Sequence, residues 1–306
     1  MNALPPGLIA APFTAFHDNG ELNLDLVEVQ ARSLIKNGVV GAFVCGTTGE
    51  GPSLSSEERC QVVEAWVKSR KDQLKVIVHV GHASAAEARL LARHAQDSGA
   101  DAVASVAPYF FKPASVDELV SWCADVAAAA PRLPFYYYHI PSITNVTIPT
   151  SAFLAAARHR IPNLAGIKFT HEDLEDYAAT RAIGGKDHDV LFGRDELLLE
   201  GLRAGATGAV GSTYNYAAPL YQSLIAAFRS RDLETAASEQ AKARAFIDVM
   251  IKFGGLPAGK AIMKLIGIDC GPVRLPLKRF RPENEQLLRR ALEAVKFFEF
   301  CSKTAS

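Results

Sequence analysis

A lysine inside an apolar stretch is the residue in this sequence best suited to carry out chemistry. Lys168 lies between Ile167 and Phe169, and the surrounding segment 164–170 is typical of a buried strand in a parallel sheet. Burial lowers the pKa of a lysine because desolvation disfavours the ammonium form, and the neutral amine can attack a ketone to form a Schiff base. The segment alone equally allows a strand-end lysine that reaches solvent or pairs with a carboxylate.

A polar turn, Gly46-Thr47-Thr48-Gly49-Glu50, offers a second set of groups. Its glycines let backbone N–H groups approach an anion, and the two threonine hydroxyls add donors, so a substrate carboxylate would fit there. The turn lacks the Gly-Lys-Ser/Thr ending of a P-loop. An ordinary connection between a strand and a loop is the alternative interpretation.

Tyr136, Tyr137 and Tyr138 place three phenols on one predicted strand. Side chains alternate along a strand, so Tyr137 should face away from the other two. One phenol close to Lys168 could shuttle a proton. For Tyr136 and Tyr137 we favour packing between the sheet and its helices.

Asp195 and Glu196 are adjacent acids at the end of another predicted strand. Glycoside hydrolysis needs two carboxylates that face one bond, whereas neighbouring side chains on a strand point in opposite directions. We therefore expect these acids to hold a substrate with several hydroxyl groups. His79 and His82 are a weak metal-binding pair, because no nearby acid or cysteine completes a ligand set, and we expect no metal site.

The composition is that of an ordinary soluble enzyme: 49% of the 306 residues are apolar, and 33 basic residues balance 33 acidic ones. The neutral balance argues against nucleic acid as a partner, and no apolar run is long enough to span a membrane. Five scattered cysteines and a start without signal-peptide features indicate reduced thiols in a cytoplasmic protein.

Eight short apolar runs recur along the chain, separated by helical patterns. The runs cover 7–13, 39–46, 75–81, 101–109, 134–140, 164–170, 189–195 and 205–212. Helix starts are marked by S-x-x-E patterns at Ser55, Ser84 and Ser115, by 149–151, and by an amphipathic pattern over 23–37. This alternation predicts an α/β fold, a (β/α)8 TIM barrel.

Further helical patterns over 217–230, 233–253, 257–266 and 283–301 predict the last barrel helix and a C-terminal helical extension. We expect one catalytic domain over 1–306, with the barrel at about 7–230 and the C-terminal helices at about 231–302. Active sites of TIM barrels lie at the C-terminal ends of the strands, where the groups described above should meet.

Three motifs carry a family resemblance, in this order along the chain: a G-[ST]-T-G-E loop, a Y-x-[IV]-P strand and a G-[ILV]-K strand. Together they resemble the pyruvate-dependent Schiff-base aldolases of the dihydrodipicolinate synthase and N-acetylneuraminate lyase superfamily, over about residues 7–299. Within it the sequence is most similar to the N-acetylneuraminate lyases, especially the animal-type form. That likeness rests on 107–113, 133–141, 166–169, 205–215 and 274–277.

The resemblance implies a role for each matching residue. Lys168 matches the Schiff-base lysine, and Tyr138 matches the catalytic tyrosine. Thr47 and Thr48 match the pair that binds the carboxylate of the 2-keto acid. The positions that hold the hydroxyl-rich tail of the sugar are matched by Thr170, Gly193, Asp195, Glu196 and Ser212. Arg194 falls at a position that varies in the family, so the resemblance assigns it no role.

The implied reaction is cleavage of N-acetylneuraminate, a sialic acid, to N-acetylmannosamine and pyruvate, without a metal or an organic cofactor. A homotetramer is implied as well, with Tyr109 near a subunit boundary. The synthase branch has an arginine for a second carboxylate where this chain has Ile143, which counts against dihydrodipicolinate synthase. Two alternatives remain: an aldolase for another 2-keto-3-deoxy sugar acid or a synthase-like enzyme, and a silent paralogue that only binds a keto acid.

Overall fold

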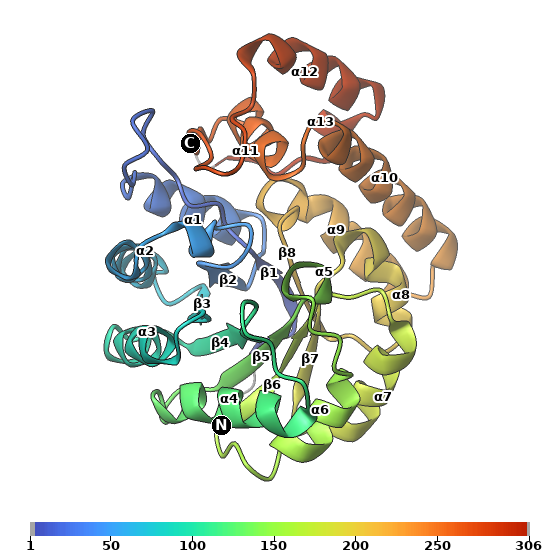
Figure 1. Ribbon diagram of the computed structural model, residues 1–306. Helices are drawn as coiled ribbons and strands as arrows, with labels where there is room; N and C mark the ends of the chain where they lie inside the picture. The colour runs from blue at the N-terminus through green and yellow to red at the C-terminus, as the bar shows by residue number, and fades with distance from the viewer. Residues whose placement is uncertain (1–3, 305–306) are drawn as a thin grey trace.

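A closed barrel of eight parallel strands forms the centre of the computed structural model, which describes residues 4–304 (Figure 1). The strands are β1 (Gly7–Ala10), β2 (Gly41–Val44), β3 (Lys75–His79), β4 (Ala102–Val106), β5 (Phe135–His139), β6 (Leu164–Phe169), β7 (Asp189–Phe192) and β8 (Gly208–Gly211). They pair in sequence order, and β8 closes the barrel on β1. The predicted TIM barrel is confirmed.

Every predicted run contains a strand, but the strands are shorter than the runs. β2 ends where Cys45 adopts a φ of 57°, outside the extended region, and Pro12 follows the end of β1 without an N–H to donate. The residues at the end of each predicted run therefore belong to the loops that follow the strands.

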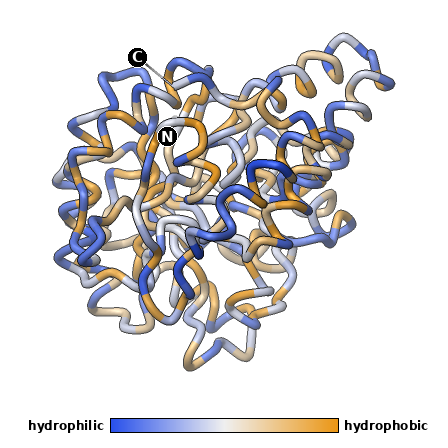
Figure 2. The backbone as a smooth tube through the Cα atoms, turned by 90° about the horizontal axis from the view of Figure 1, so that it is seen from above, coloured by the Kyte–Doolittle hydropathy of each residue, from blue (hydrophilic) through white to orange (hydrophobic). Residues whose placement is uncertain are grey.

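Helices follow the strands and surround the barrel. They are α1 (Leu26–Lys36), α2 (Ser56–Ser69), α3 (Ala85–Asp97), α4 (Val116–Ala128), α5 (Pro141–Thr144), α6 (Thr150–Ala157), α7 (Leu174–Gly184), α8 (Leu198–Arg203) and α9 (Tyr214–Arg229). Ser55, Ser84 and Ser115 each accept a hydrogen bond from the backbone N–H three residues on, and Ser55 completes a capping box with Glu58. Figure 2 shows polar and apolar residues alternating along these helices, as expected when one face covers the barrel.

The C-terminal extension comprises α10 (Leu233–Lys252), α11 (Leu256–Leu265), α12 (Glu285–Ala294) and α13 (Phe297–Phe300), and it lies beside α9 at one side of the barrel (Figure 1). The single helix predicted over 283–301 is wrong in one respect: Lys296, at a φ of 58°, separates α12 from α13. No helix within 4–304 is both long and apolar enough to cross a membrane.

Alternation of side chains divides the core into two parts. Each strand contributes at least one residue to an inner cluster: Ile9, Phe43, Ile77, Ala102, Tyr136, Ala165, Leu191 and Val210. Tyr137 faces outward, with its ring centroid 4.5 Å from that of Phe153 on α6. The packing prediction holds for Tyr137 but is wrong for Tyr136. Tyr136 shares the inward face with Tyr138, and its hydroxyl donates to Oδ2 of Asp189 at 2.8 Å.

Candidate active site

A cavity of about 230 Å³ lies at the carboxyl ends of the strands. It is lined by residues of β5, β6 and β8, by the loops after β1, β2 and β7, and by α10. All the site residues predicted from the sequence line it: Thr47, Thr48, Tyr138, Lys168, Thr170, Gly193, Asp195, Glu196 and Ser212. The barrel thus brings together groups that lie far apart in the chain.

Lys168 lies on β6 with 4% of its surface exposed, and its neighbour in register on β5 is Tyr138. Its Nζ is 3.8 Å from the ring centroid of Phe43 and 3.9 Å from that of Tyr138. Burial lowers the pKa of Lys168 to about 7, although the nearby Asp195 carboxylate opposes this shift. A large fraction of the amine is therefore neutral at neutral pH.

Tyr138 stands between this amine and the Gly46–Glu50 turn. Its Oη lies 3.3 Å from Oγ1 of Thr47, so the two hydroxyls share a hydrogen bond. Burial raises the pKa of Tyr138, and the hydrogen bond with Thr47 opposes the rise. The phenol is therefore protonated at neutral pH, and its ring lies directly against the Lys168 amine.

The turn that carries Thr47 and Thr48 is held by buried contacts on its far side. The Thr14 hydroxyl donates to the Gly49 carbonyl at 2.6 Å. Glu50, at a φ of 54°, is 3% exposed and places its Oε1 2.8 Å from Nζ of Lys260 on α11. The two threonines thus project from a backbone that is anchored to the C-terminal extension.

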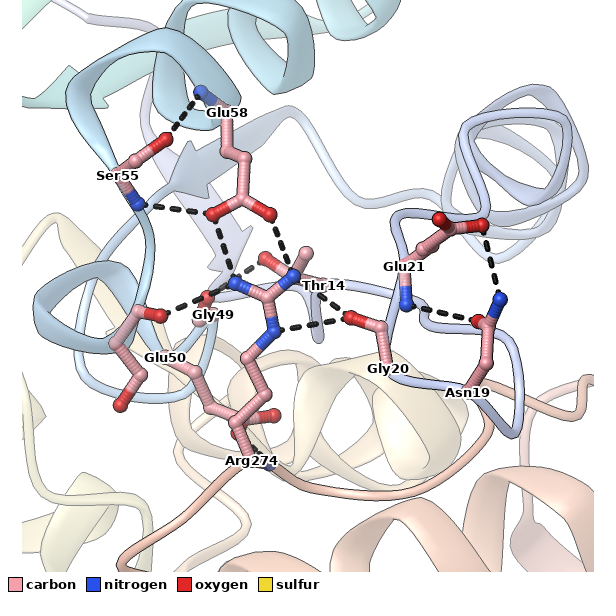
Figure 3. A network of polar contacts seen from close by, with 10 residues as sticks. Thr14, Asn19, Gly20, Glu21, Gly49, Glu50, Ser55, Glu58 and Arg274 are labelled. Atoms are coloured by element: carbon pink, nitrogen blue, oxygen red, sulfur yellow. Dashed lines mark hydrogen bonds and ion pairs between the residues drawn. The ribbon is translucent and has the colours of Figure 1, made fainter.

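Arg274 extends this anchor, as Figure 3 shows. Its backbone N–H donates to Oε2 of Glu50 at 2.8 Å. Its guanidinium donates to both carboxylate oxygens of Glu58, at 2.5 and 2.7 Å, and to the Gly20 carbonyl at 2.7 Å. A paired arrangement of this kind fixes direction as well as distance. The segment after α11 is therefore tied to the start of α2 and to the turn.

Replacement of Lys260 by methionine should lower the free energy of unfolding by about 3–5 kcal/mol, because it leaves the Glu50 carboxylate buried without its cation. Urea denaturation measures this loss. The double variant Lys260→Met/Glu50→Gln should recover much of it. Lys264→Met is the matched control: Lys264 lies one turn further along α11 with 49% of its side chain exposed, and it should cost less than about 1 kcal/mol. Equal losses at the two lysines would contradict the prediction.

Asp195 lies in a 3₁₀ turn, η2 (Asp195–Leu197), and not on a strand as predicted, because β7 ends at Phe192. Its Oδ2 accepts hydrogen bonds from the backbone N–H and the hydroxyl of Thr213, at 3.0 and 2.6 Å. A Cβ atom at Gly211 would lie 1.8 Å from Oδ1 of Asp195, so this approach requires glycine. Burial raises the pKa of Asp195 to about 6, and the bonds from Thr213 oppose the rise.

The other predicted tail-binding residues line the same wall. Gly193 lies against Thr170, since a Cβ atom there would be 2.1 Å from Oγ1 of Thr170. Ser212 is partly exposed where the chain leaves β8. Oε1 of Glu196 lies 2.8 Å from a guanidinium nitrogen of Arg194, which lines the cavity too.

Sequence reasoning missed one wall of the cavity. Ile247, Met250 and Ile251 on α10 line it, and Thr213 supports Asp195 from beneath. The apolar pattern over 233–253 indicated a helix, but nothing in it told which of its apolar residues would face the cavity rather than α9.

The two histidines considered for metal binding have separate partners. His79 is 4% exposed, with Nδ1 3.1 Å from the Cys45 carbonyl oxygen, while Nδ1 of His82 accepts the backbone N–H of Ser84. The part of the chain that the structure describes has no group of three or more histidine, cysteine or acidic residues that could hold a metal ion.

A TIM barrel that carries a buried amine, a phenol and polar donors at the carboxyl ends of its strands has the active-site arrangement of the TIM-barrel enzymes. The sequence matches the dihydrodipicolinate synthetase family over residues 4–295. The chain therefore belongs to this family.

Within this family, the chain is similar to several N-acetylneuraminate lyases. The N-acetylneuraminate lyases of Rattus norvegicus and Homo sapiens are each 44% identical over 299 residues, which cover 96% of this chain and 93% of each relative. Among solved structures, the N-acetylneuraminate lyase of Proteus mirabilis superposes with a TM-score of 0.94 at 43% identity, covering 97% of this chain and all (100%) of that one. The Aliivibrio salmonicida lyase, also termed sialic acid aldolase, gives a TM-score of 0.94 at 42% identity, covering 97% of this chain and 98% of that one.

Proposed function

We propose that this protein is a Schiff-base aldolase that cleaves N-acetylneuraminate to N-acetylmannosamine and pyruvate. The observation that carries the proposal is the Lys168 amine, whose pKa is lowered to about 7, directly beside Tyr138 in a cavity that several polar side chains line. The near full-length similarity to N-acetylneuraminate lyases supports the choice of substrate.

In the proposed reaction, the open-chain keto acid places its carboxylate on Thr47 and Thr48. The neutral amine of Lys168 attacks C2, and loss of water gives a Schiff base whose iminium form accepts electrons. The positive charge next to Tyr138 favours its phenolate, which takes the proton of the C4 hydroxyl. The C3–C4 bond breaks, and its electron pair passes to the iminium, which becomes an enamine.

N-acetylmannosamine then leaves as the aldehyde product. Protonation of the enamine at C3 and addition of water to the iminium release pyruvate and return the free amine of Lys168. The residues Thr170, Gly193, Asp195, Glu196 and Ser212 hold the hydroxyl-rich tail while these steps occur. The chain's own groups suffice for these reaction steps, because the iminium supplies the electron withdrawal that cleavage of the C3–C4 bond needs.

An assay of pyruvate release from N-acetylneuraminate tests the proposal. The same assay is run with 2-keto-3-deoxygluconate, a shorter keto acid that lacks the long hydroxyl-rich tail. Preference for the shorter acid would favour the alternative aldolase. Failure with both, together with retained pyruvate binding, would favour the silent paralogue. A synthase-like reaction is disfavoured because Ile143, on α5, offers no cation for a second carboxylate.

The rate of Schiff-base formation should rise with pH and level off above about pH 7, because deprotonation of Lys168 supplies the nucleophile and its pKa is about 7. Trapping with borohydride at low pyruvate concentration, measured from pH 5 to 9, gives this profile. Asp195→Asn removes the carboxylate that raises the pKa of Lys168, so its inflection should lie at lower pH. A trapping rate that still rises steeply at pH 9, as an ordinary lysine pKa of about 10.4 would give, would contradict the assignment.

We also propose that the protein is a cytoplasmic homotetramer with Tyr109 near a subunit boundary. Tyr109, Phe110 and Phe111 follow one another after β4 with 37%, 74% and 85% of their surfaces exposed. Adjacent exposed aromatic rings favour burial against another surface. Light scattering at micromolar concentration should give the mass of four chains, and a monomer would contradict this.

A further inference from the structure

Arg194 is a cation of the cavity wall to which the family resemblance assigns no role. It is held between two carboxylates, since its Nη2 lies 2.8 Å from Oε1 of Glu196 and also donates to Glu172. The side chains of Arg194 and Glu196 are 27% and 29% exposed, whereas that of Glu172 is 65% exposed. Arg194 and Glu196 therefore form a partly desolvated pair at the cavity, and Glu172 holds the pair from the solvent side.

The backbone of Glu196 is fixed independently of its side chain. Nε of Arg244, on α10, donates to the Glu196 carbonyl at 2.8 Å, and its Nη2 lies 2.8 Å from Oε1 of Glu200. This contact sets the position of η2 but leaves the long Glu196 side chain free to rotate. The Arg194 guanidinium is what selects one arrangement of that side chain, because a charge-assisted bond is both short and directional.

The charges around Glu196 require such a partner. The carboxylate of Asp195 is the next side chain along, and its pKa is raised in part by the charge of Glu196. Two acids so close repel each other, and Glu196 would turn toward water without a cation beside it. With Oε1 engaged by Arg194, Oε2 remains to accept hydrogen bonds from a ligand in the cavity.

We infer that Arg194 is a positioning residue that sets the preference for a long polyhydroxyl chain by holding Glu196 in its accepting orientation. The inference rests on the proposed function, in which Glu196 binds the tail of the sugar acid. Arg194 acts on the binding of the tail and not on the Schiff-base step, because its guanidinium contacts Glu172 and Glu196, whereas the Lys168 amine lies against the rings of Phe43 and Tyr138.

Kinetics of Arg194→Gln, Glu196→Gln and the double variant test this inference. Arg194→Gln should raise KM for N-acetylneuraminate roughly tenfold, as loss of a hydrogen bond to a charged group would, with kcat changed much less. It should leave pyruvate trapping at Lys168 and turnover of 2-keto-3-deoxygluconate within about twofold. Added to Glu196→Gln, it should change KM by less than about twofold, because a residue acting only through Glu196 has nothing left to position.

Two further variants complete the design. Arg194→Lys keeps the charge without the planar fork and should restore part of the loss. Arg89→Gln removes a comparable surface pair with Asp125, between α3 and α4, and should leave all constants unchanged. The competing explanation is that Arg194 binds the substrate directly. Its buried Nε has no hydrogen-bond partner among residues 4–304 and could donate to a ligand.

The outcomes separate these explanations. A full Arg194→Gln effect in the Glu196→Gln background means that Arg194 contacts substrate itself, and it overturns the inference. Equal losses for the long and the short keto acid, or no loss for either, overturn it as well. The unaltered protein is assayed first. If it traps pyruvate but does not cleave N-acetylneuraminate, the proposed substrate fails, whereas an active parent with an unaffected Arg194→Gln variant refutes the role of Arg194 alone.

Discussion

Borohydride added in the presence of pyruvate should attach a three-carbon group to Lys168 and inactivate the protein. Reduction captures the Schiff base, and Lys168 is the described lysine whose amine lies against Tyr138 and lines the cavity beside Thr47 and Thr48. Replacement of Lys168 by methionine removes the nucleophile while keeping an apolar chain of similar length. Activity should then fall by at least about 10⁴-fold, as it does when a covalent nucleophile is deleted.

Mass spectrometry of the digested protein locates the modification. Lys260 is the internal comparison, because it too is buried, but it pairs with Glu50 and donates to the Pro272 carbonyl at 2.7 Å. It should remain unmodified. A label on Lys260, or trapping that survives in Lys168→Met, would refute the assignment of the nucleophile.

Loss of the Tyr138 hydroxyl should lower kcat by roughly 10²–10⁴, the usual contribution of a positioned acid–base group. Tyr138→Phe keeps the ring that faces Lys168, so the amine should stay desolvated and reactive. Pyruvate trapping should therefore slow much less than cleavage of N-acetylneuraminate. Steady-state kinetics and trapping rates on the same preparation separate the two effects.

Tyr137→Phe is the matched control, since it deletes the same atom from the adjacent residue of β5. Tyr137 faces outward and packs on Phe153, away from the cavity. Its loss should leave kcat within about twofold, because surrounding contacts and not catalysis depend on it. Near-normal turnover in Tyr138→Phe, or comparable losses in both variants, would mean that the phenol of Tyr138 does not move the proton.

The barrel and most of its site were predictable because their signals are local. The setting of Lys168 needed only its two neighbours, and the helix starts at Ser55, Ser84 and Ser115 needed only four residues each. In a parallel barrel all strands end at the same face, so the residues that follow the strands lie together there. This is why residues as distant as Thr47 and Ser212 could be expected in one place.

The features that could not be predicted depend on contacts between distant segments. The wall formed by Met250 arises from how α10 crosses the barrel, and a helical pattern does not encode that crossing. The sequence gives no sign that Arg194 would lie between Glu172 and Glu196. The break at Lys296 could not be predicted, because a left-handed residue at a helix end is usually glycine or asparagine and here it is lysine.

The buried pair between Glu50 and Lys260 has a consequence for how such chains can be recombined. A fragment that stops at residue 230 would keep the barrel strands but lose both Lys260 and Arg274, the two partners of the Glu50 carboxylate at the end of the turn that carries the threonines. A chimera with a crossover between these two positions inherits the carboxylate from one parent and the amine from the other, so it tolerates only parents that share both. The barrel and the extension should therefore be exchanged only together. On this ground we propose that residues 1–306 form a single catalytic domain.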